Sequence, residues 1–189
     1  IEKIKEKQPE FRDEKLERYK KEFDIPQYDA EILTESKHMA DIFEETTAIC
    51  GKPKKVSNWL MVETMRLLKE HSMEPEDISF SPANLAKLIG LTEDGTINSS
   101  VAKEVFEQVF EKNVDPESYV EEHGLKTVND EGALEEVLKE VIAKNPKAIA
   151  DYKGGKEKAL GALVGQTMKA MKGKANPGMV IEKLREMLN

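Results

Sequence analysis

Several features that would point to particular functions are scarce in this sequence. Cys50 is the only cysteine, so the chain offers no internal disulfide and no cysteine cage for a metal, and a reducing cytoplasm is the simplest compartment. Aromatic residues make up 6% of the chain, which gives no sign of an aromatic platform for stacking single-stranded nucleic acid. No apolar run approaches the ~18 residues of a membrane span, and the first residues lack the pattern of a secretory signal. We therefore expect neither secretion nor a membrane partner.

An excess of positive charge is also missing. The chain has 29 Lys and Arg against 37 Asp and Glu, a net charge of −8. This balance excludes a generally basic nucleic-acid protein and argues against a DNA partner, but it allows a locally basic surface. The length of 189 residues fits one or two domains, and a hydrophobic content of 39% suffices for a core.

Residues that could form an active site do not converge in the sequence. His38, His71 and His123 lie far apart, and none has a second His or Cys at metal-binding spacing. Cys50 has no nearby base in the sequence to activate it. Three pairs of adjacent glutamates would point about 100° apart on a helix, so they do not face one substrate. We predict no catalytic residue, no metal ligand and no cofactor within this chain.

Helix start and stop signals punctuate the chain. Ser81-Pro82, Asp115-Pro116 and Asn176-Pro177 each place a capping residue before a proline, the pattern of a helix N-terminus. Several glycines lie where helical patterns end: Gly51, Gly90, Gly124, Gly154, Gly155 and Gly173. No segment shows the sustained alternation of a strand. We predict an all-α fold.

Apolar residues recur at helical spacing and predict buried stripes. Three stripes are expected in the last third of the chain: Leu134, Val137, Leu138, Val141 and Ile142; Leu160, Leu163, Val164, Thr167, Met168 and Met171; and Val180, Ile181, Leu184, Met187 and Leu188. An earlier stripe is Val101, Val105, Phe106, Val109 and Phe110. The segment from Trp59 to Leu68 is apolar nearly all round, so we expect it at the centre of a first core.

A shift in charge predicts a domain boundary. Residues 127–189 hold 11 Lys and Arg against 9 Asp and Glu, whereas residues 1–126 hold 18 against 28. We predict a larger acidic helical domain over 1–126, a small tail domain over 127–189, and a linker near 124–130. The chain starts at Ile1 inside a charged helix-like segment, so we also expect it to be part of a longer protein.

Lysines concentrate in the tail domain. Between positions 144 and 174 there are eight lysines and only two acidic residues, Asp151 and Glu157. On a helical wheel, Lys158, Lys169 and Lys172 share one flank with Gly161 and Gly165, about 60° to 140° from Val164. A phosphate backbone could approach the main chain at the glycines while ammonium groups flank it. Two other interpretations stay open: the glycines admit a neighbouring helix, or the lysines are an ordinary solvated face.

The turn over 173–177 adds an anion-binding possibility. It ends one helix and starts the next, whose N-terminus carries positive dipole near Lys172 and Lys174. We assign Asn176 to capping this helix. A tight corner without a ligand explains the turn equally well. A second basic cluster, Lys52 to Lys55, could touch the same ligand or be a solvated loop.

The sequence resembles a known family at this point. The tail run from Gly155 to Gln166, followed by Met168-Lys169 and by Lys172 to Pro177, is similar to the C-terminal signature of the GatB subunit of aspartyl/glutamyl-tRNA amidotransferase, the GatB/YqeY type of tail. Upstream segments match the helical domain of the same subunit in order: Arg18-Tyr19, Tyr28-Asp29-Ala30, Leu33-Thr34, Phe43-Glu44, Asn58-Trp59-Leu60, Asp94-Gly95-Thr96-Ile97, Ala102 to Phe106, and Asn145-Pro146. The resemblance covers essentially the whole chain.

The resemblance implies a three-subunit cytoplasmic ligase complex. An amidase subunit releases ammonia from glutamine, and a small third subunit ties the others together. The GatB subunit uses ATP and Mg²⁺ to phosphorylate the carboxylate of Glu or Asp misacylated on tRNA(Gln) or tRNA(Asn), and ammonia then gives the amide. That chemistry belongs to an N-terminal part absent from this sequence, so ATP and Mg²⁺ are expected there and no catalytic residue is transferred.

The residues and the resemblance together predict an RNA-binding tail that recognises backbone and shape. The predicted RNA-binding residues are Lys153, Lys156, Lys158, Gly161, Gly165, Lys169, Lys172, Lys174 and Asn176. Two rivals remain: a helical protein–protein docking module without RNA contact, and an independent enzyme, against which the lack of converging catalytic groups argues.

Overall fold

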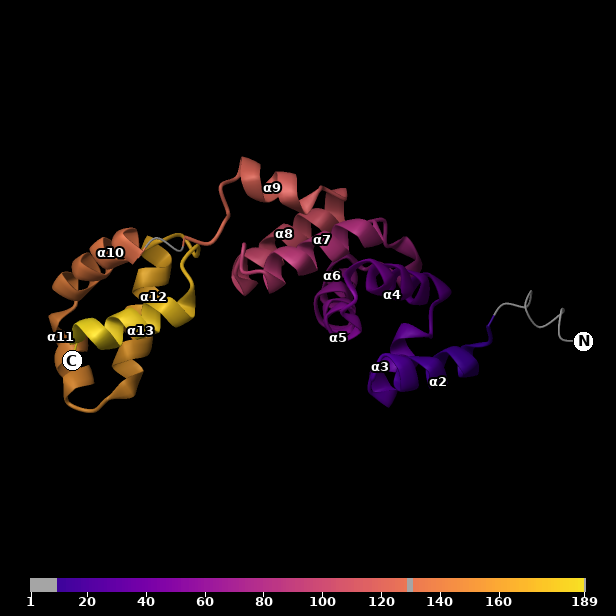
Figure 1. The fold of residues 1–189 in the computed structure, drawn as a ribbon, viewed down its shortest axis with the longest axis horizontal. Helices are drawn as coiled ribbons and strands as arrows, with labels where there is room; N and C mark the ends of the chain where they lie inside the picture. Colours follow the sequence, from indigo (N-terminus) through magenta and orange to yellow (C-terminus); the bar gives the residue numbers. More distant parts are fainter. Residues whose placement is uncertain (1–9, 129–130, 189) are drawn as a thin grey trace, which may run out of the picture. The chain divides into compact units, whose positions relative to one another are not determined.

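The computed structural model describes residues 10–128 and 131–188 (Figure 1). Every regular element in those ranges is helical, apart from a single bridge between Val128 and Ala175. The predicted all-α fold is therefore confirmed. Contacts between residues group the chain into two compact units, residues 1–90 with 105–119 and residues 91–104 with 120–189. The predicted boundary after residue 126 stays a prediction, and residues 129–130 of the predicted linker lie outside the described residues.

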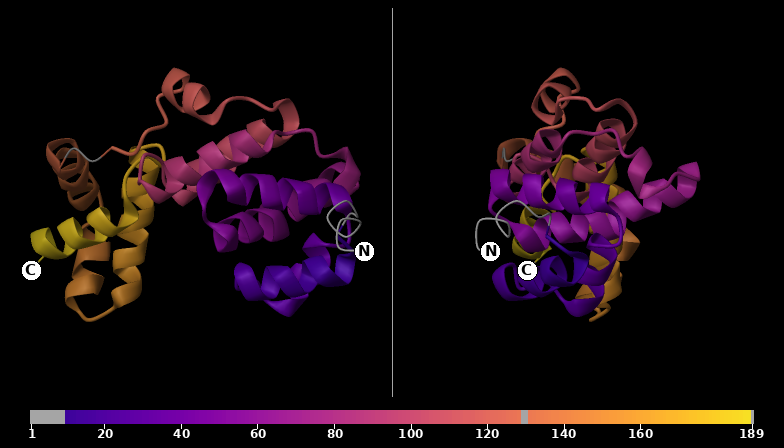
Figure 2. Two further views of the ribbon diagram at one scale, coloured as in Figure 1. Left: turned by 45° about the vertical axis from the view of Figure 1, so that its right-hand side comes forward. Right: turned by 90° about the vertical axis from the view of Figure 1, so that its right-hand side faces the viewer.

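The first unit is built from short helices. It contains α2 (Arg12–Glu22), α3 (Gln27–Leu33), α4 (Lys37–Cys50), α5 (Pro53–Asn58), the π-helical turn η1 (Trp59–Thr64), α6 (Met65–His71) and the 3-10 turn η2 (Pro75–Asp77), with parts of α7 (Pro82–Glu93), α8 (Ser99–Lys112) and α9 (Pro116–Glu122). Figure 2 shows the pair α2 and α3, in indigo, beside the purple helices that follow, and α3 contacts η1.

Aromatic side chains fill the core of this unit. The rings of Tyr19 and Phe43 lie 4.7 Å apart between centroids, and both side chains are fully buried. Phe106 joins a second group, with its ring centroid 5.1 Å from that of Trp59 and 5.7 Å from that of Phe80. Such tilted and edge-on pairs add about 0.5–1.5 kcal/mol each beyond the burial of their area. The scarce aromatics are therefore used mainly for packing.

The second unit contains the bundle of α10 (Glu131–Lys144), α11 (Pro146–Lys153), α12 (Glu157–Ala170) and α13 (Pro177–Leu188). Its core is formed by the predicted stripes: Leu134, Leu138, Val141, Leu160, Leu163, Val180, Leu184 and Leu188 are buried together with Ala175. Full burial of each large apolar side chain contributes about 1.5–3 kcal/mol. The three stripes predicted for this region are confirmed.

The three predicted capping pairs also form. The backbone N–H of Asn84 donates to Ser81 Oγ, that of Ser118 to Asp115 Oδ1, and that of Gly178 to Asn176 Oδ1. The helices that follow begin at Pro82, Pro116 and Pro177. A polar residue that accepts a first-turn N–H, followed by a residue that has none, fixes where each helix starts.

Two local predictions are wrong. Gly90 does not end a helix, because α7 continues through it to Glu93. The segment around Trp59 is not buried all round: Val62 is 51% exposed and Met65 is 37% exposed. The helix widens into the π-helical turn η1 at this point, where Thr64 Oγ1 donates to the carbonyl of Trp59. The turn shifts the register of the face that points outward, and periodicity at 3.6 residues cannot anticipate this.

Candidate nucleic-acid interface

The junction between α11 and α12 carries the first three predicted lysines. Lys153 is the last residue of α11, Lys156 is the N-cap of α12, and Lys158 lies in its first turn, all with exposed side chains. Lys156 Nζ lies 3.0 Å from Asp151 Oδ1 and is 72% exposed, so this pair contributes at most about 1 kcal/mol. Lys153 and Lys158 make no ion pair with any described residue. Their full charge is thus available to a ligand.

Gly161 and Gly165 leave the backbone of α12 uncovered. Both lie inside the helix on its exposed side, and a Cβ added at either position would meet no atom within 4 Å. The alternative that they admit a closely packed neighbouring helix is therefore wrong within the described part of the chain. Glycine in a helix interior costs roughly 0.8–1 kcal/mol relative to alanine. No internal contact offsets this cost.

The end of α12 differs from the helical wheel. The helix ends at Ala170, and Lys172 follows in a left-handed conformation with φ 53°, before Gly173 with φ 74°. The N–H of Gly173 donates over 2.7 Å to the carbonyl of Met168, which closes the helix C-terminus. Lys169 is in the last helical turn, so Lys158 and Lys169 remain on one helix while Lys172 projects from the turn.

The same turn leads into α13. Lys174 is half-buried, and Asn176 caps α13 by accepting the N–H of Gly178 at 2.9 Å. Pro177 has no N–H. Two amides of the first turn are therefore unavailable to an anion, so the N-terminus of α13 offers fewer donors than the sequence suggests.

A residue that the sequence reasoning missed holds this turn in place. Asn98 caps α8 by accepting the N–H of Val101 at 3.0 Å, and its amide group donates to the carbonyls of Gly173 and Ala175. The backbone N–H of Val128 donates to the carbonyl of Lys174 at 2.8 Å. Asn98 just before Ser99 is a recognisable N-cap signal, but its partners Gly173 and Ala175 are distant in the sequence, which a local pattern cannot show.

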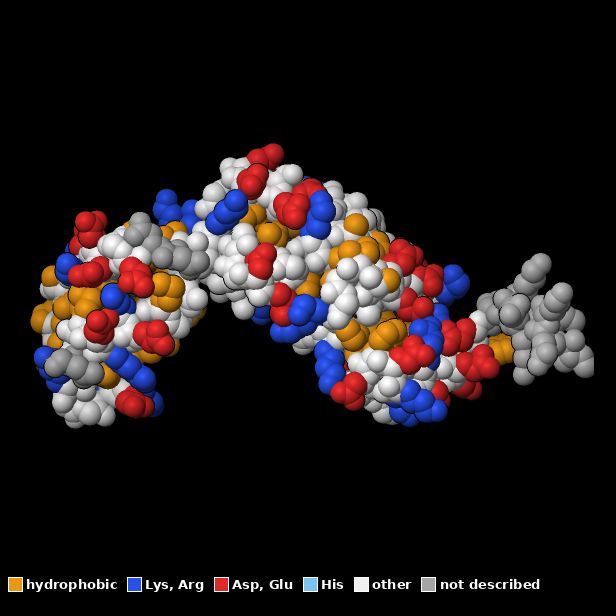
Figure 3. All heavy atoms as spheres, in the orientation of Figure 1, with side chains coloured by type: hydrophobic (Ala, Val, Ile, Leu, Met, Phe, Trp, Pro, Cys, Tyr) orange, Lys and Arg blue, Asp and Glu red, His pale blue; other side chains and the backbone are white. Residues whose placement is uncertain are grey.

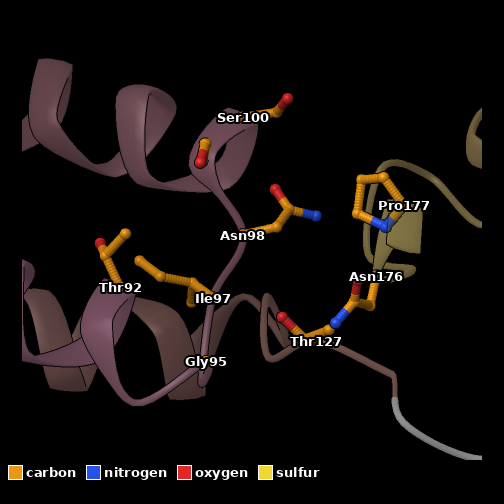
Figure 4. A pocket seen from close by; sticks show the side chains of 9 residues that line it. Thr92, Gly95, Ile97, Asn98, Ser100, Thr127, Asn176 and Pro177 are labelled. Atoms are coloured by element: carbon orange, nitrogen blue, oxygen red, sulfur yellow. The ribbon is translucent and has the colours of Figure 1, made fainter. Parts of the chain in front are cut away.

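These segments enclose a small polar cleft within the second unit (Figure 4). It has a volume of about 290 Å³, and its lining includes Asn98, Ser99, Ser100, Thr127, Asn176 and Pro177. The Oγ1 atom of Thr127 is buried and has no hydrogen-bond partner in the described part of the chain. The cleft lies beside the turn that carries Lys172 and Lys174, so it borders the predicted interface.

Other lysines of the second unit are neutralised by neighbouring acids. Lys139 lies 3.0 Å from Glu135 and Lys144 lies 3.4 Å from Glu140, both at i,i+4 spacing on α10. The hydrogen bond from Lys139 lowers the pKa of Glu135. Lys158, Lys169 and Lys172 have no such partner among the described residues. The structure therefore separates paired lysines on α10 from unpaired lysines on and after α12.

The remaining sequence candidates have structural roles or partners. His38 Nε2 lies 2.8 Å from the carbonyl oxygen of Ile78, and His71 lies 3.8 Å from a carboxylate oxygen of Glu111. Lys54 of the second basic cluster forms an ion pair with Asp24. Within the described ranges, no three His, Cys, Asp or Glu side chains are grouped to hold a metal ion. None of the described helices is long and apolar enough to cross a membrane.

Comparison with known proteins identifies relatives along the whole chain. Three relatives, each named as the GatB subunit of aspartyl/glutamyl-tRNA(Asn/Gln) amidotransferase, are 67% identical (Agathobacter rectalis), 62% identical (Lachnospira eligens) and 47% identical (Thermodesulfovibrio yellowstonii). The alignments cover 98–100% of this chain and 40% of each relative. The chain thus spans about two fifths of the length of these curated relatives.

A family pattern gives the same assignment. The pattern described as the GatB domain matches residues 41–188, which include all nine predicted RNA-binding residues. The match covers well over half of the chain and extends from α4 to the end of α13. The chain therefore belongs to the GatB domain family.

Proposed function

We propose that this chain is the tRNA-binding, non-catalytic portion of the GatB subunit of an aspartyl/glutamyl-tRNA amidotransferase. The observation that supports it best is the uncovered face of α12. There Lys158 and Lys169 have no ion-pair partner among the described residues and flank Gly161 and Gly165, over which no side chain packs. A phosphodiester backbone needs positive charge and close approach, and this face provides both.

The names of the relatives point to the reaction in this proposal. The complete complex converts Glu-tRNA(Gln) or Asp-tRNA(Asn) to the amidated form, acting as a carbon–nitrogen ligase with glutamine as amido donor in the cytoplasm. Its partners are an amidase subunit, a small third subunit and tRNA(Gln) or tRNA(Asn). ATP and Mg²⁺ act in the remainder of the GatB subunit, so we assign no step of the chemistry to residues of this chain.

The residues of this chain would contribute binding and orientation. Lys153, Lys158, Lys169 and Lys172 neutralise phosphates, while Asn98 fixes the turn from which Lys172 and Lys174 project. The contacts are to backbone, so tRNA identity is read by shape and not by base edges. Lys156, held by Asp151, is expected to contribute less than Lys158.

A pair of matched variants tests the proposal. Lys158→Gln/Lys169→Gln removes two unpaired charges, whereas Lys139→Gln/Lys144→Gln removes two charges already paired on α10. Both change the net charge by −2. We expect the first variant to weaken tRNA binding and the second to leave it near wild type. Equal effects would mean that the lysines act only through net charge, and the absence of tRNA binding would favour the helical docking module.

A further inference from the structure

A groove of about 480 Å³ opens in the first unit, far in sequence from the lysines of α12. It lies where the start of α3 meets the helix formed by α5 and η1, and α3 contacts η1 directly. Figure 3 shows hydrophobic side chains exposed at the surface in this region of the first unit. The groove is independent of the predicted RNA-binding face.

One wall of the groove is apolar and unusually exposed. Ile25 is 3% exposed and forms part of the lining with Met61, while Val62 is 51% exposed and Tyr28 is 69% exposed. The other aromatic rings of this unit pack mostly in clusters, but Tyr28 makes no ring contact with any described residue. The π-helical turn η1 carries both Met61 and Val62, and such turns are frequent at functional sites.

The polar side chains of the groove lack partners. Ser57 is 3% exposed, yet its Oγ has no hydrogen-bond partner in the described part of the chain. A buried hydroxyl without a partner is unfavourable, and most such groups in folded proteins are satisfied. Asp29 is half-buried and makes no ion pair with a described residue, whereas Asp24 at the rim is bound to Lys54. The groove thus offers one unpaired carboxylate and one unpartnered hydroxyl.

These four features fit one kind of side chain. An aliphatic stem can pack against Met61 and Val62, a planar cation can stack on the ring of Tyr28, and its N–H groups can reach Asp29 and Ser57. Guanidinium meets all of these requirements, because it is planar, weakly hydrated and has five donors. The surroundings favour a basic partner, since residues 1–90 and 105–119 hold 16 Lys and Arg against 23 Asp and Glu, a net of −7.

We propose that this groove binds an arginine side chain presented by a basic segment of a partner protein. The proposal does not depend on RNA binding by the tail. It predicts that a carboxylate, an aromatic face and an apolar wall act on the same guanidinium, so that removal of any one weakens binding while the fold persists.

The test uses the 189-residue chain with ¹³C-methyl-labelled methionine and the peptide acetyl-Gly-Arg-Gly-amide. The Met61 methyl signal, assigned through Met61→Leu, should shift and saturate. The citrulline peptide, which is isosteric but uncharged, should bind at least tenfold more weakly. Asp29→Asn and Tyr28→Ala should each raise the Kd at least threefold, and Tyr28→Phe should retain binding because the ring remains.

Matched controls lie elsewhere on the same unit. Asp41→Asn removes a carboxylate outside the groove, and Ile49→Ala shortens an aliphatic side chain that is 59% exposed. Both should bind the arginine peptide as wild type does, as should Lys158→Gln/Lys169→Gln. Lack of a saturable shift at 20 mM peptide, equal binding of the citrulline peptide, or an unchanged Kd in Asp29→Asn would each overturn the proposal. Thermal unfolding of every variant separates loss of binding from loss of fold.

Discussion

The two glycines of α12 allow a prediction in which stability and binding move in opposite directions. Gly161 and Gly165 lie inside α12, and a Cβ at either position meets nothing within 4 Å. Alanine should therefore fit without strain and remove the glycine cost of about 0.8–1 kcal/mol at each site. Gly161→Ala/Gly165→Ala should raise the free energy of unfolding by about 1.6–2 kcal/mol.

The assay is thermal and urea unfolding, followed by tRNA titration. For a chain of this size, about 2–4 °C per kcal/mol gives a rise of roughly 3–8 °C in the unfolding midpoint. The same variant should bind tRNA more weakly, because two methyl groups now hold a phosphodiester away from the helix backbone. The protein would become more stable and less able to bind.

A third glycine provides the control. Gly173 also has open space around an added Cβ, but its φ of 74° is unfavourable for any residue with a side chain. Gly173→Ala should lower the free energy of unfolding by about 1 kcal/mol or more. If Gly161→Ala/Gly165→Ala destabilises the protein, the two glycines are covered or lie outside a regular helix, and the reasoning is refuted.

Two further predictions concern the supports of the fold. Asn98→Ala removes a helix cap and two hydrogen bonds to the 173–175 turn, so it should lower the free energy of unfolding by about 1–3 kcal/mol and broaden the amide signals of Gly173 and Ala175 in NMR spectra; sharp, unshifted signals would contradict its role. The hydrogen bonds of Asp115 to Lys87 and to the N–H of Ser118 lower its pKa below the ordinary value of 3.8. Its contribution to stability is therefore present above pH 3.8 and is lost as the pH falls through the folded-state pKa. Urea midpoints measured between about pH 2.5 and 6 should fall less on acidification in Asp115→Asn than in wild type, and parallel curves would show that this carboxylate is not the group responsible.

Local chemistry explains which parts of the fold could be predicted from the sequence. Asn176-Pro177 and Asp115-Pro116 define helix starts through the capping oxygen and the missing N–H, which depend on adjacent residues alone. The stripes on α10, α12 and α13 depend only on a period of 3.6 residues. Gly90 shows the limit, because a glycine signals a helix end only where the backbone adopts positive φ, and here α7 simply continues.

The candidate site was predictable in its charges but not in its supports. The lysine-rich and glycine-rich pattern identified exposed residues on α12, and the exposure of Gly161 and Gly165 resolves one of the two open interpretations. The left-handed Lys172 and the hydrogen bonds of Asn98 to the 173–175 turn arise from tertiary contacts, which no local pattern shows. The RNA-binding role of these residues stays a prediction.

The most direct test of the central claim is tRNA binding by this chain across a salt series. Each phosphate contact contributes about 0.7–0.9 to the slope of log K against log salt. The account predicts that wild type binds with a steep slope and that Lys158→Gln/Lys169→Gln loses affinity together with roughly 1.5–2 units of slope. The Lys139→Gln/Lys144→Gln control should keep both. Identical slopes in wild type and Lys158→Gln/Lys169→Gln would contradict the claim that the uncovered face of α12 contacts RNA.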